Sequence, residues 1–239
     1  MDSGLTENIF LKPENNTNFK VEGRDNGMGY LSPENKDSKI GLLVIQEWWG
    51  LNKNMVNICD RFAKEGFRSL CVDIYRGKIA KDMESANHLM TGLDWMGALK
   101  DIQGATNFLK ENGCTHVALT GYCMGGALVL AALINTEGYC CGVPFYGCPD
   151  LSQNDVKKIK CPVLAMFGET DDLKGFSDVE QAKKLEAAMK DANLKDSSIK
   201  IWPGVGHAFM NVDNTKKYNE ETAKKAFAET VEFVKKHSC

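Results

Sequence analysis

The stretch Gly121-Tyr122-Cys123-Met124-Gly125-Gly126 decides the fold that we expect of this chain. An apolar run at 117–120 precedes it and a run of small and apolar residues at 127–134 follows it, which predicts a strand, a sharp turn and a helix. The flanking glycines keep side chains apart around a strained backbone, and the helix start favours a thiolate and a developing oxyanion. The stretch therefore predicts a nucleophile elbow, as in hydrolases, with cysteine as the nucleophile. The competing interpretation is a plain tight turn.

Length and composition limit the classes of protein that this chain can belong to. Its 239 residues, 43% of them hydrophobic, suit a single α/β domain over 1–239, with a polar and flexible segment at 1–16. The net charge of -3, with acids and bases interspersed, disfavours a nucleic-acid partner. The start lacks a basic and apolar leader and no apolar run is long enough to span a bilayer, so we expect no membrane contact and no secretion.

The cysteines point to a reducing compartment. There are nine, an odd number, and most stand in apolar surroundings, as Cys59, Cys71 and Cys161 do. We expect free thiols in a cytoplasmic protein. Cys-x-x-Cys pairs with nearby histidines are missing from the sequence, so we expect no zinc or other metal.

The order of apolar runs and helical patterns predicts the sheet. Runs at 18–22 and 27–31 flank an Asp-Asn-Gly turn and predict an antiparallel hairpin at one edge. Further buried strands are predicted at 40–45, 67–72, 117–120, 142–145, 163–167 and 199–202. Helices are predicted around 54–64, 95–112, 127–134, 178–190 and 218–236. This alternation is typical of a mostly parallel central sheet with helices on both faces.

A nucleophilic thiol needs a base and a carboxylate that orients the base. In α/β-hydrolase sheets the acid follows one late strand and the histidine follows the last strand. Here Asp171 follows the run at 163–167 and His207 follows the run at 199–202. We therefore predict a triad of Cys123, Asp171 and His207, with Asp172 as the alternative acid. As alternatives, Asp171 could cap a turn and His207 could be an ordinary loop residue.

The other three histidines have no comparable setting. His88 lies in a polar helical stretch, His116 begins a strand and His237 is near the end of the last helix.

Three more residues complete the predicted site. Glu47 stands just after the buried run at 40–45, where a charged side chain destabilises the fold unless it has a partner or takes part in catalysis. The backbone N–H of Trp48 and that of Met124 are predicted to donate to the oxyanion. The tryptophan rings themselves fit a core role.

These motifs together resemble the dienelactone hydrolases, also called carboxymethylenebutenolidases. The pieces that carry the resemblance are Glu47-Trp48-Trp49-Gly50, Asp73-Ile74-Tyr75-Arg76-Gly77, the elbow, Phe167-Gly168-Glu169-Thr170-Asp171 and Pro203-Gly204-Val205-Gly206-His207-Ala208-Phe209. The resemblance implies an α/β-hydrolase fold, the triad named above and no metal or organic cofactor. It also implies that Glu47 contacts the resting thiol and takes its proton when substrate binds.

The chain departs from this family where the substrate is recognised. Bacterial dienelactone enzymes hold the substrate carboxylate with two arginines, one after the Asp-x-Tyr segment and one after the catalytic histidine. Here Arg76 stands one place earlier and the stretch 208–211 contains no arginine. Arg76 is predicted to bind an anion; it could also pair with Glu47 or be a surface arginine. Tyr75 and Phe209 are predicted to contact the substrate, and Trp95 and Met96 to be pocket walls or core residues.

The resulting hypothesis is a cytoplasmic, monomeric hydrolase of small-molecule lactones or activated esters that forms an acyl-enzyme on Cys123. One alternative is a catalytically idle α/β-hydrolase fold that binds small molecules or partners. Another is a redox role for Cys123, which would need a low thiol pKa.

Overall fold

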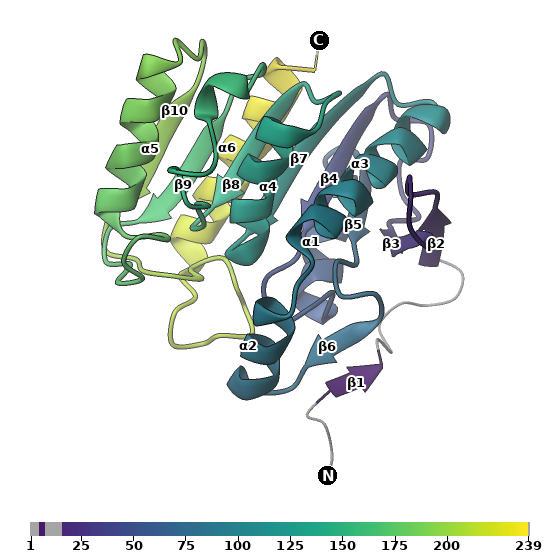
Figure 1. Ribbon diagram of the computed structural model, residues 1–239, viewed down its shortest axis with the longest axis horizontal. Helices are drawn as coiled ribbons and strands as arrows, with labels where there is room; N and C mark the ends of the chain where they lie inside the picture. The colour runs from purple at the N-terminus through teal and green to yellow at the C-terminus, as the bar shows by residue number, and fades with distance from the viewer. Residues whose placement is uncertain (1–4, 8–15, 239) are drawn as a thin grey trace. The chain divides into compact units, whose positions relative to one another are not determined.

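A computed structural model describes residues 5–7 and 16–238 of the chain (Figure 1). The chain divides into two compact units, residues 1–117 and 118–239, and the boundary falls within strand β7 (His116–Tyr122). One domain over 1–239 stays a prediction. Of the polar segment predicted at 1–16, residues 1–4 and 8–15 lie outside the described residues.

The first unit contains a four-stranded arrangement in the order β4-β5-β3-β2. β4 (Ile40–Ile45) pairs in parallel with β5 (Arg68–Val72). β3 (Gly27–Leu31) is antiparallel to β5, and β2 (Asn16–Phe19) is antiparallel to β3 and ends the order. The predicted antiparallel hairpin at one edge of the sheet is therefore confirmed.

The first strand of that hairpin was predicted two residues too late, at 18–22. β2 ends at Phe19, because the next residues leave the sheet and lie against helix α3 (Trp95–Glu111). A Cβ atom at Gly104 of α3 would come 2.5 Å from the carbonyl oxygen of Lys20 and 2.9 Å from the Val21 side chain, so the glycine lets the backbone approach the helix. Val21, at 7% exposed, is buried there rather than paired in a strand.

Helix α1 (Lys53–Lys64) could be predicted from the sequence because it has a capping residue and a regularly spaced apolar face. The Asn52 side chain accepts a hydrogen bond from the N–H of Met55 at 3.1 Å and caps the helix. Its buried face consists of residues spaced three and four apart, among them Met55, Ile58, Cys59 and Phe62.

The sequence did not predict the start and end of three short elements in the first unit. The polar helical stretch around His88 is α2 (Met83–Thr91), which Asp82 and Ser85 begin with a capping box. The short strands β1 (Leu5–Glu7) and β6 (Lys78–Ala80) pair antiparallel. Strands of three residues carry too little periodicity to be recognised in a sequence.

The second unit contains a fully parallel arrangement in the order β10-β9-β8-β7. β8 spans Cys141–Phe145, β9 Leu164–Gly168 and β10 Ser198–Trp202. The buried strands predicted from 40–45 onward agree with the observed ones to within two residues at each end. Parallel neighbours require crossover connections, and helices provide them here.

The helices of the second unit are α4 (Met124–Asn135), α5 (Val179–Asp191) and α6 (Glu220–Lys236), with the short 3₁₀ helix η1 (Val156–Lys158). Both α4 and α6 pack on β8, and Figure 1 shows α4 in front of the strands of this unit and α6 behind them. The two faces of this parallel sheet are thus covered. Every residue of α4 except Asn135 is buried, which explains its uninterrupted run of apolar and small side chains.

Among residues 5–7 and 16–238, no helix combines the length and the apolar character that crossing a membrane requires.

Candidate active site

Cys123 occupies the sharp turn between β7 and α4. Its backbone has φ 55° and ψ -117°, a conformation that costs free energy for any residue with a side chain. The surrounding hydrogen bonds hold it there. The Cys123 N–H donates to the carbonyl oxygen of Phe145 at 3.0 Å, and the Cys123 carbonyl accepts from the N–H groups of Gly126 and Ala127 at 2.9 and 3.2 Å.

Two glycines leave room for this turn. A Cβ atom at Gly126 would overlap the carbonyl oxygen of Phe145, and one at Gly147 would overlap the carbonyl oxygen of Cys123. Gly126 belongs to the predicted elbow. Gly147 follows β8, and no sequence motif marks it, because its contact with the elbow arises only when β7 and β8 pair. Both positions require glycine for steric reasons.

The structure brings Cys123, His207 and Asp171 together. The Nε2 atom of His207 lies 3.1 Å from the Cys123 sulfur, and its Nδ1 atom lies 2.8 Å from Oδ2 of Asp171. The three residues follow β7, β10 and β9, whose carboxyl ends meet at one edge of the parallel arrangement. All three are at most 9% exposed. An imidazole in this position can take the thiol proton at Nε2 while the carboxylate orients it through Nδ1.

Asp171, rather than Asp172, is the acid in contact with the histidine. The N–H of Leu173 donates to Oδ1 of Asp171 at 3.2 Å, so both carboxylate oxygens are engaged. The neighbouring Asp172 is exposed.

The Ser177 hydroxyl is a second partner of the histidine. Its Oγ lies 3.1 Å from Nδ1 of His207, and the side chain has no exposed surface. Ser177 stands in the loop that leads to α5, and no sequence signal marks it because the contact depends on the path of that loop. The rings of Tyr146 and Phe176 also flank the imidazole, with centroids 5.1 and 6.3 Å away.

Phe209 and the two candidate wall residues have different surroundings. Phe209 is fully buried, with its ring centroid 5.3 Å from that of Tyr146 and 6.2 Å from that of Phe145. Its contact with substrate stays a prediction. Trp95 and Met96 begin α3 and are 38% and 65% exposed, so the core role considered for them is wrong.

Glu47 and Trp48 belong to the first unit. Glu47 is 3% exposed, and its carbonyl accepts the N–H of Gly50 at 3.2 Å, which closes a tight turn after β4. The rings of Trp48 and Trp49 meet edge to face at 5.2 Å. The expected roles of Glu47 and Trp48 beside Cys123, which belongs to the other unit, stay predictions.

Arg76 is engaged within the first unit. Its guanidinium donates to Oδ1 of Asp101 at 2.6 Å and to the backbone carbonyls of Asn26 and Asp25 at 3.0 and 3.3 Å. Burial raises the pKa of the Asp101 carboxyl, and the charge of Arg76 counteracts that rise. Arg76 therefore forms its ion pair with Asp101, and the pairing with Glu47 that the sequence suggested as an alternative is wrong. The neighbouring Tyr75 is 6% exposed, and its N–H donates to the Asp73 carboxylate at 3.1 Å.

Replacing Arg76 by methionine tests whether it binds substrate or holds the fold. Because Asp101 is 1% exposed, loss of this partner leaves a buried carboxylate with Arg24 at 3.6 Å. We expect the free energy of unfolding to fall by about 1–3 kcal/mol in urea titrations. We expect the ratio of kcat/KM for carboxylate-bearing and neutral esters to be unchanged. A selective loss for the carboxylate-bearing ester, at unchanged stability, would instead identify Arg76 as the anion site.

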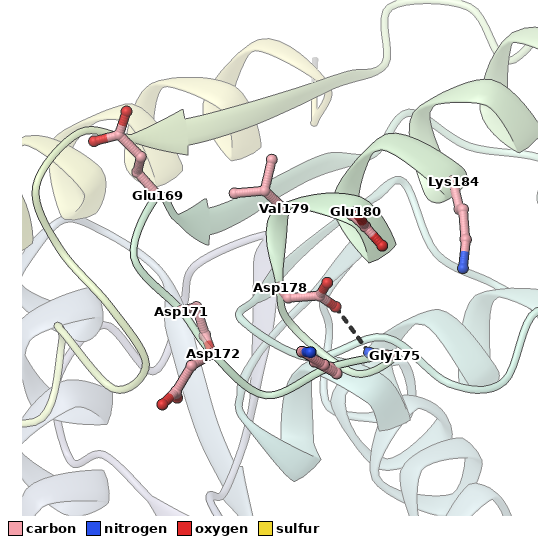
Figure 2. A pocket seen from close by; sticks show the side chains of 9 residues that line it. Glu169, Asp171, Asp172, Gly175, Asp178, Val179, Glu180 and Lys184 are labelled. Carbon is pink, nitrogen blue, oxygen red and sulfur yellow. Dashed lines mark hydrogen bonds between the residues drawn. The ribbon is translucent and has the colours of Figure 1, made fainter.

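A pocket of about 510 Å³ opens in the second unit, beside the loop that follows β9 and carries Asp171. Figure 2 shows Asp171 and Asp172 on one side of it, and Asp178, whose carboxylate accepts the N–H of Gly175 at 2.8 Å, on the other. The remaining lining residues are Glu169, Lys174, Val179, Glu180 and Lys184. A lining of carboxylates and lysines with a single aliphatic side chain does not suit the apolar part of an ester substrate.

Comparison with known proteins assigns the family. The family model of the dienelactone hydrolases matches residues 28–238. The chain belongs to the dienelactone hydrolase family. Protein usf of Aquifex pyrophilus is 34% identical over 238 residues, which cover 91% of this chain and 97% of that protein. The "Putative carboxymethylenebutenolidase" of Aquifex aeolicus is 33% identical over 228 residues, which cover 90% and 96% of the two chains.

The fold agrees with that of the dienelactone hydrolase family. The crystal structure of a dienelactone hydrolase-like promiscuous phosphotriesterase from metagenomic libraries superposes with a TM-score of 0.78 at 18% identity. The match covers 98% of this chain and 99% of that one. The predicted α/β-hydrolase fold and the resemblance to dienelactone hydrolases are confirmed.

Proposed function

We propose that this dienelactone hydrolase-family protein hydrolyses lactones or activated esters through an acyl-enzyme on Cys123. The observation that carries the proposal is the position of the His207 ring, with Nε2 3.1 Å from the Cys123 sulfur and Nδ1 2.8 Å from the Asp171 carboxylate. A buried thiol in contact with an oriented imidazole is the arrangement that nucleophilic acyl transfer requires.

The reaction begins with transfer of the Cys123 proton, to His207 Nε2 or, as the family resemblance implies, to Glu47. The thiolate attacks the substrate carbonyl carbon, and the carbonyl oxygen takes up the negative charge. The N–H of Met124, at the start of α4, and the N–H of Trp48 are the proposed donors to that oxyanion. The C–O bond to the leaving group then breaks, and the group that took the Cys123 proton releases it to the leaving oxygen or to solvent, so His207 is neutral before deacylation. Finally His207 takes a proton from water, whose oxygen attacks the thioester and releases the acid and the thiol.

The nucleophile restricts the substrate class. A thiolate leaves a tetrahedral intermediate more readily than a poor alkoxide does, so attack leads to product only when the leaving group is good. Enol lactones and activated esters meet this condition and amides do not. The proposed partner is accordingly a small-molecule lactone or ester, acted on by a monomer without a cofactor.

A cytoplasmic location is part of the proposal. It rests on the eight cysteines in the described part of the chain, all of which are free thiols.

Trapping the acyl group on Cys123 tests the proposal. Wild-type protein is mixed with a chromogenic acetate ester or with a dienelactone, quenched in acid within one turnover and mapped by mass spectrometry. We expect a thioester-linked acyl adduct on the peptide that carries Cys123 in the wild-type protein and no thioester on that peptide in the Cys123→Ser protein. An adduct with the ester alone would keep the mechanism and reject the lactone. Saturable binding without any adduct would favour the idle binding fold.

Ser177 is expected to position His207 for this reaction. Loss of its hydroxyl removes one hydrogen bond at Nδ1, and we expect Ser177→Ala to lower kcat about 2- to 10-fold with KM unchanged. Steady-state kinetics with an activated ester measure this split, and Ser177→Thr, which keeps the Oγ atom, serves as the conservative control. A rise in KM, or an equal loss in both variants together with a lower Tm, would indicate a packing role instead.

A further inference from the structure

A cluster of three thiols lies at the end of the second unit's strands that is remote from the triad. Cys140 and Cys141 stand at the start of β8, and Cys161 stands shortly before β9. Ser238, just after α6, completes the group, and its Oγ lies 3.3 Å from the Cys140 sulfur. Because the strands are parallel, their first residues are at the opposite edge from the carboxyl ends that carry Cys123, Asp171 and His207. The mechanism proposed above does not use this thiol cluster.

Cys140 and Cys161 stand at corresponding positions just before the point where the chains of β8 and β9 begin to pair. Gly142 forms a parallel bridge with Val163, and its N–H donates to the carbonyl oxygen of Pro162 at 3.0 Å. Two residues back along both chains stand Cys140 and Cys161. Neighbouring strands lie about 4.7–4.9 Å apart, which is within the Cα separation of about 4.4–6.8 Å that disulfides take, and Cys140 and Cys161 lie in the bends that lead into this pairing. Both residues are partly exposed, so the site lies near enough to the surface for a small oxidant to reach it.

Cys141 differs from these two in its surroundings. It has no exposed surface, and it pairs with Ala118 of β7 inside the sheet. Its Cα is about 3.8 Å from that of Cys140, as for any adjacent pair, which is shorter than an ordinary disulfide allows. The geometry therefore favours Cys161 over Cys141 as a disulfide partner for Cys140.

The groups facing Cys140 favour its thiolate. A hydrogen bond from the Cys141 thiol lowers the pKa of Cys140 below its ordinary value, and the Ser238 hydroxyl, in contact with the sulfur, lowers it further. The Ser238 hydroxyl also reaches the carbonyl oxygen of Val234 at 2.8 Å and can turn from it toward a thiolate. Burial instead raises the pKa of Cys161 to about 12, and the nearby Cys140 adds to that rise. One member of the pair is thus the nucleophile and the other keeps its proton.

We propose that Cys140 and Cys161 form a peroxide-oxidisable dithiol site, separate from the hydrolytic site. The Cys140 thiolate attacks one oxygen of hydrogen peroxide, the O–O bond breaks, and Cys140 becomes a sulfenic acid with release of hydroxide. The Cys161 sulfur then attacks the Cys140 sulfur, the S–O bond breaks, and the departing hydroxide takes the Cys161 proton and leaves as water. In sum, one peroxide and two thiols give one disulfide and two waters.

The test uses Cys123→Ser protein, so that oxidation of the triad thiol cannot affect the result. After mild hydrogen peroxide treatment, blocking of remaining thiols and tryptic digestion, we expect a cross-linked peptide pair. Lysines 157, 158 and 160 separate Cys140 from Cys161, so the two cysteines fall on different peptides. We expect the cross-link to disappear on adding Cys140→Ser or Cys161→Ser and to persist on adding Cys239→Ser.

A second measurement needs no variant at the site. With limiting iodoacetamide at pH 7, we expect Cys140 to be alkylated more than about tenfold faster than Cys161, because its thiolate forms at a lower pH than that of Cys161. A cross-link to Cys141, a stable oxidised Cys140 without a cross-link, or equal alkylation rates would each overturn the proposal. Ester hydrolysis by Cys161→Ser protein is expected to match wild type, so the outcome is independent of the proposed hydrolase activity.

Discussion

Cys123→Ala is expected to lower kcat for an activated ester by about 10⁴- to 10⁶-fold. Removal of the sulfur leaves His207 and Asp171 in place, but no atom remains to form the acyl-enzyme. Only binding and the oxyanion donors can then act on a water molecule, which accounts for a small residual rate. Stopped-flow and long-time-course assays with the same ester cover this range.

Cys148→Ala is the matched control for loss of a buried thiol. Cys148 follows β8 and contacts Nε2 of Gln181 at 3.4 Å, and burial raises its pKa to about 11. Such a thiol carries no thiolate at neutral pH, so we expect the wild-type kcat. A Cys123→Ala protein that kept the rate of this control would refute the proposed mechanism.

Asp171→Asn is expected to lower kcat by about 10⁴-fold with little change in stability. The amide is nearly isosteric with the carboxylate, but its NH₂ group can donate to Nδ1 of His207. That donation would leave the ring proton on Nε2, which faces the Cys123 sulfur and must be free to accept the thiol proton. The loss would therefore arise from the wrong tautomer rather than from unfolding, and thermal unfolding of the variant checks this.

Asp172→Asn changes the neighbouring charge by the same amount. Because Asp172 is exposed and the histidine contact belongs to Asp171, we expect the variant to keep the wild-type kcat. A large loss in Asp172→Asn together with a small one in Asp171→Asn would assign the acid to the other residue, the alternative that the sequence left open.

The order of the helices and strands could be predicted from the sequence because each element has a local pattern of apolar residues. Buried parallel strands appear as short, fully apolar runs, and helices such as α1 show a repeat of three to four residues. Short or edge elements were not fully legible. β2 ends early because residues 20 and 21 pack on Gly104, a contact between segments more than 80 residues apart.

Residue types and their order along the chain were sufficient to predict a nucleophile elbow at Cys123, an acid at Asp171 after the strand at 163–167 and a histidine at His207 after the last strand. The sequence favoured Asp171 but left Asp172 open as the acid, and it did not indicate Ser177, Gly147 or the Asp101 partner of Arg76. Each of these depends on where a loop passes relative to a strand or helix distant in the sequence. Local sequence determines which elements form, whereas contact between residues 24 or more positions apart is decided only when strands pair and helices pack around them.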